Sequence, residues 1–172
     1  MSELERLYQA HGAALLAYLR RSFASCGDPE DLLHDTFVQA MRHQDRLAQA
    51  ISPQAWLFGI ARHVGLTAAR RHRTVTPLDA AQPAPAEAPR LAALRQAMAN
   101  LPLPLRQALE LRLYDRLSYE EIAQVLEVPI STIRSRLHSA LIRLRQAMDD
   151  ESADNDQRSK GHGPSNTQTI DD

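Results

Sequence analysis

The sequence predicts an all-α protein in which two small helical domains are joined by a linker rich in proline and alanine. Apolar residues recur at helical spacing in two stretches, one before residue 74 and one after residue 90. Four prolines interrupt residues 74–90, and a helix does not continue through such a segment. The chain of 172 residues is long enough for two such units. We therefore expect domains at 1–73 and 91–148, a linker at 74–90, and a disordered acidic tail at 149–172.

The charge of the chain is nearly balanced overall, but it is unevenly distributed. Residues 149–172 hold seven acidic residues against two basic ones, so the rest of the chain is net positive. The single cysteine, Cys26, excludes an internal disulfide and is compatible with a reducing cytosol. Apolar runs are short, and the N-terminus lacks a signal pattern. We expect a cytoplasmic protein with no membrane insertion.

Two helices with clear start signals are predicted first. Ser2 and Glu5 form a capping box, and the apolar pattern behind them ends near Phe23. Asp28 and Pro29 begin the second helix, with Asp as N-cap and Pro at the first helical position. The predicted buried face of this second helix consists of Leu32, Leu33, Phe37, Ala40 and Met41.

The opposite side of the second helix carries Asp31, His34 and Asp35. Taken alone, these residues are interpreted as a solvated acidic face with an incidental histidine. Glu30 and His34 lie four residues apart and could form half of a metal pair. No further ligand follows at helical spacing, so we predict no metal site.

A third helix follows a polar connection at residues 43–52. Ser52 supplies its N-cap and Pro53 its first helical position. Its predicted core residues are Trp56, Leu57, Ile60, Ala61, Val64 and Ala68. Its C-terminal part is basic and contains Arg62, His63, Arg70, Arg71, His72 and Arg73. A basic helix end suits the helix dipole, so this part could simply be a solvated surface.

The second domain is predicted to begin with two helices that form a platform for residues 118–148. The first platform helix is marked by Leu91, Leu94, Met98 and Leu101, and the second by Leu105, Ala108, Leu109 and Leu113. Next, Ser118 and Glu121 form a capping box, and Leu117 and Ile122 are spaced as a hydrophobic staple. Pro129 ends this short helix.

A longer amphipathic helix begins directly after Pro129. Its apolar stripe consists of Ile133, Leu137, Ala140, Leu141, Leu144 and Met148. The far side carries Ser131, Ser135, His138 and Ser139, with Arg134 and Arg145 on one edge and Arg136 and Arg143 on the other. Small polar residues flanked by guanidinium groups suit a helix that meets base edges between two phosphate rims. A short helix, a tight turn and a longer basic helix are typical of a helix-turn-helix, although an ordinary solvated helix remains the alternative.

These motifs resemble the promoter-binding C-terminal domain of bacterial sigma factors of the extracytoplasmic-function class. The matching segments are Leu101-Pro102, Arg106-Gln107-Ala108, Leu117 to Ala123, and Val128-Pro129 followed by Thr132 to Leu137. Arg116 and Glu127 stand where this family commonly has glycine. The resemblance implies contacts to the minus-thirty-five element by Ser131, Thr132, Arg134, Ser135, Arg136, His138 and Ser139.

The N-terminal half resembles the same family. Asp28 to Phe37 is similar to the sigma helix that docks on the clamp coiled coil of core RNA polymerase, and Asp31, His34 and Asp35 match its contact positions. Ala55 to Arg62 is similar to the promoter-melting segment. The resemblance implies contacts to the minus-ten element by Arg62, His63, Thr67, Arg70 and Arg71, and residues 43–52 are the candidate pocket for an unstacked base.

The resemblance covers roughly residues 4–148, and it implies a transcription initiation factor. Such a protein binds core RNA polymerase and promoter DNA, is commonly controlled by an anti-sigma factor, uses no cofactor and has no catalytic residues. One alternative is a stand-alone helix-turn-helix regulator, which would leave the N-terminal half unexplained. The other is a small helical enzyme using His34, His63 or His138, but the sequence has no phosphate loop or nucleophile motif to support it.

Overall fold

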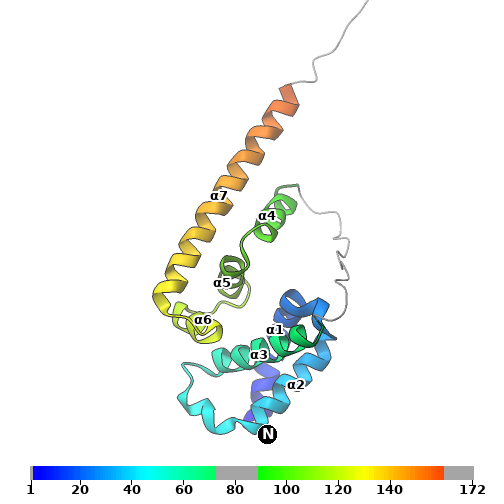
Figure 1. Ribbon diagram of the computed structural model, residues 1–172, viewed down its shortest axis with the longest axis vertical. Coiled ribbons are helices and arrows are strands. Elements are labelled where there is room, and N and C mark those ends of the chain that lie inside the picture. Colours follow the sequence, from blue (N-terminus) through cyan, green and yellow to red (C-terminus); the bar gives the residue numbers. More distant parts are fainter. Residues whose placement is uncertain (1, 73–88, 161–172) are drawn as a thin grey trace, which may run out of the picture.

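A computed structural model describes residues 2–72 and 89–160, and over these ranges it contains helices and no strand (Figure 1). In chain order the helices are α1 (Glu3–Phe23), η1 (Ala24–Cys26), α2 (Pro29–Arg42), η2 (Gln44–Gln49), α3 (Pro53–His72), α4 (Pro89–Ala99), α5 (Leu103–Leu113), α6 (Tyr119–Leu126) and α7 (Ile130–Lys160). The predicted all-α fold class, with a helix-turn-helix in its second half, is confirmed. Most of the predicted linker lies outside the described residues.

The helices begin at the predicted capping residues. The Ser2 amide donates to the Glu5 carboxylate at 2.6 Å, and the Glu5 amide donates back to the Ser2 hydroxyl at 3.2 Å. The Asp28 carboxylate accepts the Glu30 amide at 2.7 Å. Each cap gives a partner to amide groups that the first helical turn leaves unpaired. Short-range polar chemistry therefore sets where these helices start.

The N-terminal half is a bundle of α1, α2 and α3, which contact one another in all three pairs. Its interior includes Leu15, Leu19 and Phe58, which are fully buried, and the rings of Tyr18 and Phe58 lie 5.2 Å apart. Gly65 of α3 faces the Phe23 ring so closely that a Cβ atom there would lie 2.5 Å from Phe23 Cδ2. Close packing of α3 on the end of α1 therefore depends on this glycine.

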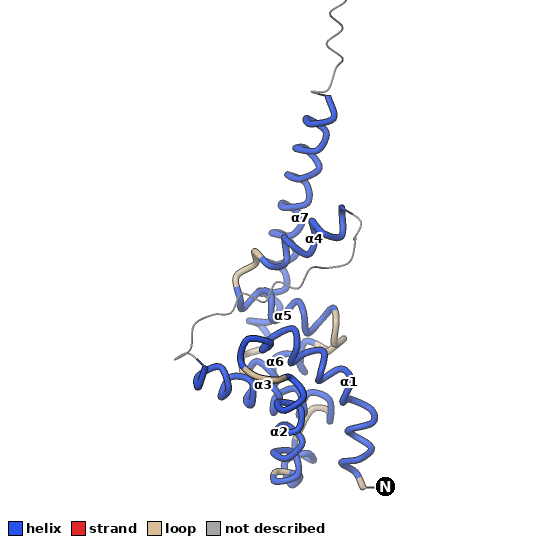
Figure 2. The backbone as a smooth tube through the Cα atoms, turned by 90° about the vertical axis from the view of Figure 1, so that its right-hand side faces the viewer, coloured by secondary structure: helices blue, strands red, loops and turns tan. Residues whose placement is uncertain are grey.

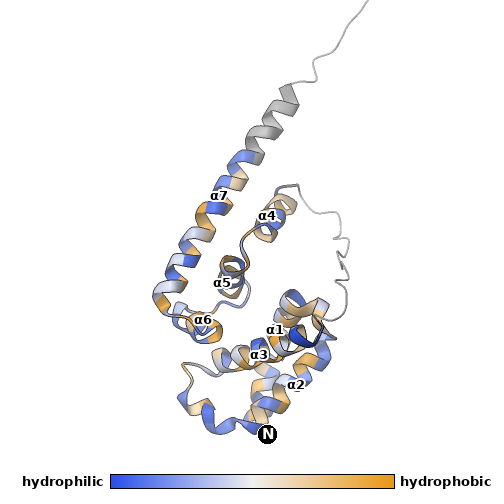
Figure 3. Cartoon of the chain, viewed as in Figure 1, coloured by the Kyte–Doolittle hydropathy of each residue, from blue (hydrophilic) through white to orange (hydrophobic). Residues whose placement is uncertain are grey.

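The C-terminal half is assembled around the first part of α7. Helices α4, α5 and α6 all pack against α7, and α5 also contacts α6. Leu117 and Ile122, the predicted staple, are both fully buried, as is Ile133 of α7. Figure 3 shows hydrophobic and hydrophilic residues interspersed along the coloured first part of α7, as expected for a helix that buries one side.

Several residues assigned to buried faces are exposed. The exposed fractions are 61% for Met41, 57% for Leu141 and 53% for Leu113. Met41 and Leu113 belong to the last turns of α2 and α5. Leu141 lies at the edge of the apolar stripe of α7, about 80° from Ile133 at the α-helical rotation. Residues at helix ends and at the edges of an apolar stripe follow the helical period, but no neighbouring helix covers their side chains.

Helix α7 is longer than the sequence analysis predicts. The predicted disordered tail begins at residue 149, whereas α7 continues to Lys160 (Figure 1). No glycine or proline occurs between Ile130 and Lys160, and Gly161 is the first such residue. Extending an existing helix requires no new nucleus, so a polar segment without a helix breaker can continue it. Residues 161–172 of the predicted tail lie outside the described residues.

The two halves pack against each other through α3 and α6, as the turned view in Figure 2 shows. Buried residues of both halves belong to one continuous hydrophobic cluster. Polar contacts also cross the boundary: the Ile51 amide donates to Gln124 Oε1 at 3.2 Å, and Gln54 Nε2 donates to the Asp115 carbonyl at 3.1 Å. In the described part of the chain, the N-terminal and C-terminal halves are therefore in direct contact.

A charged cluster also joins the halves. Arg21 Nη2, from α1, donates to Asp115 Oδ2 at 2.7 Å, and Arg21 Nε lies 3.9 Å from Glu110 Oε2. The Arg21 guanidinium also lies over the Tyr114 ring, 4.8 Å from its centroid. Only 3% of the Asp115 side chain is exposed. Burial raises the pKa of Asp115 to about 6, although the Arg21 guanidinium opposes this shift.

The raised pKa of Asp115 gives the stability of the chain a defined pH dependence. The folded chain binds this proton more tightly than the unfolded chain, whose reference pKa is 3.8. The stabilisation is therefore complete below that reference value and is lost as the pH rises through about 6. From pH 7 to pH 5 the free energy of unfolding should rise by about 1 kcal/mol relative to the Asp115→Asn variant. Urea unfolding of both proteins at the two pH values measures this difference, and identical pH dependences would contradict it.

Candidate nucleic-acid interface

The helix-turn-helix begins with a complete capping box. The Ser118 amide donates to Glu121 Oε2 at 2.7 Å, and the Glu121 amide donates to Ser118 Oγ at 3.2 Å. Partial burial is the largest single effect and acts to raise the pKa of Glu121, but the hydrogen bonds with Ser52 and Ser118 together outweigh it, so the pKa is lowered. The carboxylate is thus kept ionised at the N-terminus of α6, where the helix dipole favours negative charge.

The two turns that flank α6 have left-handed backbone at residues other than glycine. Arg116 has φ 57° and Glu127 has φ 55°. These are the positions where glycine is common in the family that the sequence resembles. The Glu127 amide donates to the Gln124 carbonyl at 3.3 Å, and the Val128 amide donates to the Ala123 carbonyl at 3.1 Å. The turns therefore keep the glycine geometry without glycine, at a cost of about 1–2 kcal/mol each.

The predicted DNA-contacting residues of α7 lie on its free side. Ser131, Arg134, Ser135 and His138 are exposed, whereas Thr132, Arg136 and Ser139 are half-buried at the margins. On the opposite side Ile133, Leu137 and Ala140 are buried against the platform helices. Arg143 and Arg145, farther along α7, are also exposed. The arrangement leaves one polar and cationic face available to a nucleic-acid groove.

A second candidate site lies between α2, η2 and α3, with Gln124 and Glu127 at its edge, and its lining carries basic residues together with the acids Asp35 and Glu127. It is a cavity of about 930 Å³ whose lining includes His63, Thr67 and Arg71 of α3. The connection at residues 43–52, the candidate pocket for an unstacked base, contributes His43, Arg46 and Gln49. Trp56, which is 8% exposed, forms part of the wall. The cavity combines hydrogen-bonding groups, positive charge and an aromatic ring, which are the features that an unstacked base requires.

The structure brings together only some of the residues predicted for this second site. Arg62 and Arg70 do not line the cavity, and Arg70 Nε instead donates to the Leu66 carbonyl at 3.3 Å. Gln39 and Arg42 of α2 also line it, although no sequence pattern marks them. Periodicity within one helix cannot identify them, because the cavity is formed where α2 and α3 meet.

The predicted polymerase-docking residues share one exposed face of α2. Asp31, His34 and Asp35 are all exposed. The helix buries Leu32, Leu33 and Phe37 on its other side, and the buried Thr36 hydroxyl donates to the Leu32 carbonyl at 2.7 Å. A partner can therefore reach this face without disturbing the bundle, and Asp35 at its edge also lines the cavity between α2 and α3.

Comparisons with known proteins give the family of the chain. Residues 7–75 match the family described as Sigma-70 region 2, and residues 91–144 match Sigma-70, region 4. The ECF RNA polymerase sigma-E factor of Escherichia coli (strain K12) is 30% identical over 156 residues, which are 79% of this chain and 80% of that protein. The chain belongs to the extracytoplasmic-function sigma factors.

Two further relatives agree with this assignment. The RNA polymerase sigma factor YlaC of Bacillus subtilis (strain 168) is 29% identical over 158 residues, covering 84% of this sigma factor and 91% of YlaC. The sigma factor RpoE of Bartonella quintana, solved in complex with the anti-sigma factor NepR, superposes with a TM-score of 0.61 at 28% identity. That match covers 83% of this sigma factor and 96% of the RpoE chain.

Within the described part of this sigma factor, no group of three or more His, Cys, Asp or Glu side chains is arranged to hold a metal ion. None of its described helices is both long and apolar enough to cross a membrane.

Proposed function

We propose that this sigma factor works in the cytoplasm, where it binds core RNA polymerase through α2 and directs it to promoters through two separate DNA-contacting surfaces. The observation that carries the proposal is that one chain combines an exposed acidic face on α2, a cavity lined in part by arginines and histidines, and a helix-turn-helix, in the order of sigma-70 regions 2 and 4. In this proposal the sigma factor contributes to promoter opening by binding DNA and separating its strands. We propose no catalytic role for any residue.

The α7 surface is proposed to bind the minus-thirty-five element as duplex. Residues near the N-terminal end of a recognition helix approach the base edges, and here these are Ser131, Arg134 and Ser135. Arginine can donate two hydrogen bonds to guanine, whereas serine bonds to several bases. His138 follows one turn later on the same exposed face.

The cavity at α2, η2 and α3 is proposed to hold a base of the minus-ten element after strand separation. Extruding a base costs a few kcal/mol, which stacking and hydrogen bonds within a pocket must offset. His63 and Thr67 offer hydrogen bonds, and Arg71 offers a positive charge for the adjoining backbone. Arg62 and Arg70, which lie outside the cavity lining, are assigned to phosphate contacts beside it.

The proposal also includes an anti-sigma partner. RpoE of Bartonella quintana was solved with the anti-sigma factor NepR, and CnrH was solved with the cytosolic domain of CnrY. CnrH has 26% sequence identity to this chain and superposes with a TM-score of 0.54. We infer that a protein of this kind holds the chain inactive until a signal releases it.

The decisive experiment is reconstitution with core RNA polymerase. The purified chain should associate with core polymerase and support transcription from a subset of a randomised duplex promoter pool. Transcripts should be enriched for two sequence elements with a fixed spacing. Tight, specific DNA binding by the chain alone, without any association with polymerase, would favour a stand-alone helix-turn-helix regulator instead.

The docking face can be tested separately. Asp31→Arg and Asp35→Arg should weaken co-purification with core polymerase, because each reverses a charge at the proposed contact. Both side chains are exposed, so the free energy of unfolding should change by no more than about 0.5 kcal/mol. Asp149→Arg makes the same charge change far along α7 and should assemble normally. Normal assembly of both α2 variants would show that the docking face is wrongly assigned.

A further inference from the structure

The turn that leads into the helix-turn-helix carries an arginine in a strained backbone conformation. Arg116 has φ 57°, a left-handed conformation that is costly for any residue with a Cβ atom. Its side chain is exposed, and no hydrogen bond, ion pair or ring contact joins it to another residue in the described part of the chain. The Arg116 side chain therefore adds strain to the fold without adding a contact.

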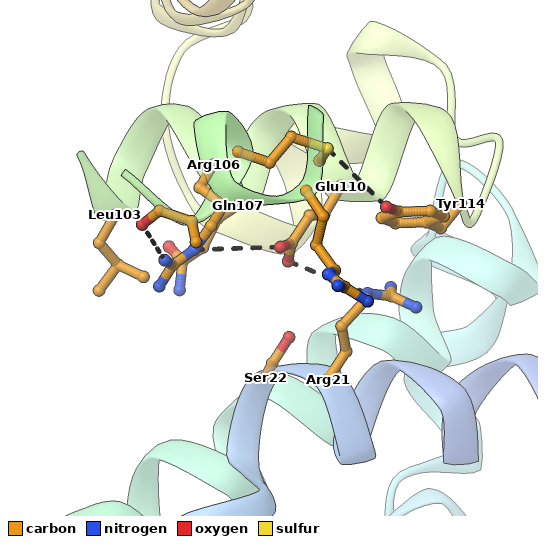
Figure 4. Close-up of a pocket in the computed structure, with 10 residues that line it drawn as sticks. Arg21, Ser22, Leu103, Arg106, Gln107, Glu110 and Tyr114 are labelled. Atoms are coloured by element: carbon orange, nitrogen blue, oxygen red, sulfur yellow. Dashed lines mark hydrogen bonds and ion pairs between the residues drawn. The ribbon is translucent and has the colours of Figure 1, made fainter. Parts of the chain in front are cut away.

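The residues on either side hold the turn in this conformation. Asp115 is buried and accepts a hydrogen bond from Arg21 Nη2 at 2.7 Å. Figure 4 shows Arg21 reaching from α1 to the ring of Tyr114, which directly precedes Asp115. On the other side, Leu117 is fully buried and its amide donates to the Leu111 carbonyl at 3.2 Å. Strain of this kind persists where the surrounding structure fixes the backbone, and it is concentrated at functional sites.

Arg116 lies just before Ser118, the N-cap of α6. Arg112 of α5 donates from Nη1 to the Leu117 carbonyl at 2.8 Å, and its guanidinium lies 5.4 Å from the centroid of the Tyr119 ring. Arg112, Arg116 and Tyr119 are all exposed. In a helix-turn-helix the first helix crosses the phosphate backbone while the second lies in the groove. The Arg116 guanidinium is therefore expected beside a phosphate rim when α7 occupies the groove.

We propose that Arg116 contacts a phosphate of the minus-thirty-five duplex from outside the recognition helix α7. This inference rests on the proposed function. The phosphate contact offsets the left-handed strain, because glycine at this position would relieve the strain but supply no charge. A phosphate contact positions the protein on the duplex without reading its sequence, so Arg116 should raise the affinity for all sequences alike.

Arg116→Gly separates the effect on the fold from the effect on DNA, because the two are expected to have opposite signs. Removing the Cβ atom relieves more strain than the added flexibility of glycine costs, so Tm should rise by about 1–3 °C. Binding of the holoenzyme to the randomised duplex promoter pool should weaken by about three- to tenfold, and the salt slope should fall by about 0.9.

Two further variants control for charge. Arg116→Lys keeps a cation in the turn, so the affinity of its holoenzyme should stay within about twofold of the wild-type value. Arg6→Ala removes an exposed positive charge from α1 and should leave binding to the pool unchanged.

The outcomes separate this inference from the proposed function. Unchanged affinity and salt slope in Arg116→Gly would overturn the inference, and so would a fall in Tm, which would give the side chain a role in the fold. A changed sequence preference would also overturn it, because it would indicate a base contact. In each of these cases the wild-type holoenzyme still selects promoters from the pool. If it selects none, the proposed function fails and this inference fails with it.

A neutral DNA backbone locates the contact. In the duplex that the wild-type holoenzyme enriches from the pool, the phosphates around the minus-thirty-five element are replaced one at a time by uncharged methylphosphonate. At the contacted phosphate, the replacement should weaken binding of the wild-type and Arg6→Ala holoenzymes by about threefold or more, and it should not weaken the Arg116→Gly holoenzyme further. Equal effects in all three proteins at every position would overturn the proposal.

Discussion

Replacing Arg134 or His138 by alanine is expected to cost about 1–3 kcal/mol of binding to the preferred minus-thirty-five sequence and to relax discrimination at one or two base pairs. Both side chains are exposed on the free face of α7, and Arg134 lies near the helix end that approaches the base edges. Arg143 is exposed farther along α7. Arg143→Ala should weaken all sequences alike and reduce the salt slope by about one unit, because Arg143 is proposed to contact a phosphate.

Binding of holoenzyme to a library of minus-thirty-five variants, at two salt concentrations, separates these outcomes. Arg143→Ala is the control for loss of positive charge without loss of base contact. If both Arg134→Ala and His138→Ala leave the sequence preference unchanged, then another face of α7 enters the groove.

Alanine at Gly65 is expected to destabilise the N-terminal bundle by about 1–3 kcal/mol. The added Cβ would lie 2.5 Å from the Phe23 ring, which is itself buried, so the end of α1 or the course of α3 must shift. The same exchange at Gly59 of α3 meets no atom within 4 Å of the new Cβ. Gly59→Ala should therefore stabilise the chain by about 0.5–1 kcal/mol through helix propensity.

Thermal unfolding of the two glycine variants measures this contrast directly. Because both changes add one methyl group to one helix, any general effect of alanine appears in both. Equal shifts of Tm would mean that the Phe23 ring can move aside at little cost. Opposite shifts would establish that α3, which carries the cavity residues, is held in place by its contact with α1.

The features that could be predicted from the sequence are those encoded over short distances. Ser2, Asp28, Ser52 and Ser118 identify helix starts, because a cap and its amide partners lie within one turn. Helical periodicity likewise places most of the buried residues. The free face of α7 follows from the same argument, since its polar residues lie opposite Ile133.

The features that could not be predicted depend on contacts between distant segments. Arg21 and Asp115 are separated by 94 positions, and neither belongs to a periodic pattern that would pair them. The α2 residues of the cavity become neighbours of His63 only when the bundle forms. The polar composition of residues 149–160 predicts disorder, whereas α7 continues through them, because extending a helix requires only the absence of a breaker.

The position of Trp56 makes its intrinsic fluorescence a probe of the proposed minus-ten cavity. It is the only tryptophan in the chain, and it forms part of the wall of the proposed minus-ten cavity. Indole emission depends on the polarity of its surroundings and is commonly quenched by a stacked base. Neither α6 nor α7 contains a tryptophan, so duplex binding there adds no direct signal. Strand entry at the cavity can therefore be followed in the unlabelled holoenzyme as a difference spectrum against a Trp56→Phe chain, which subtracts the tryptophans of the polymerase.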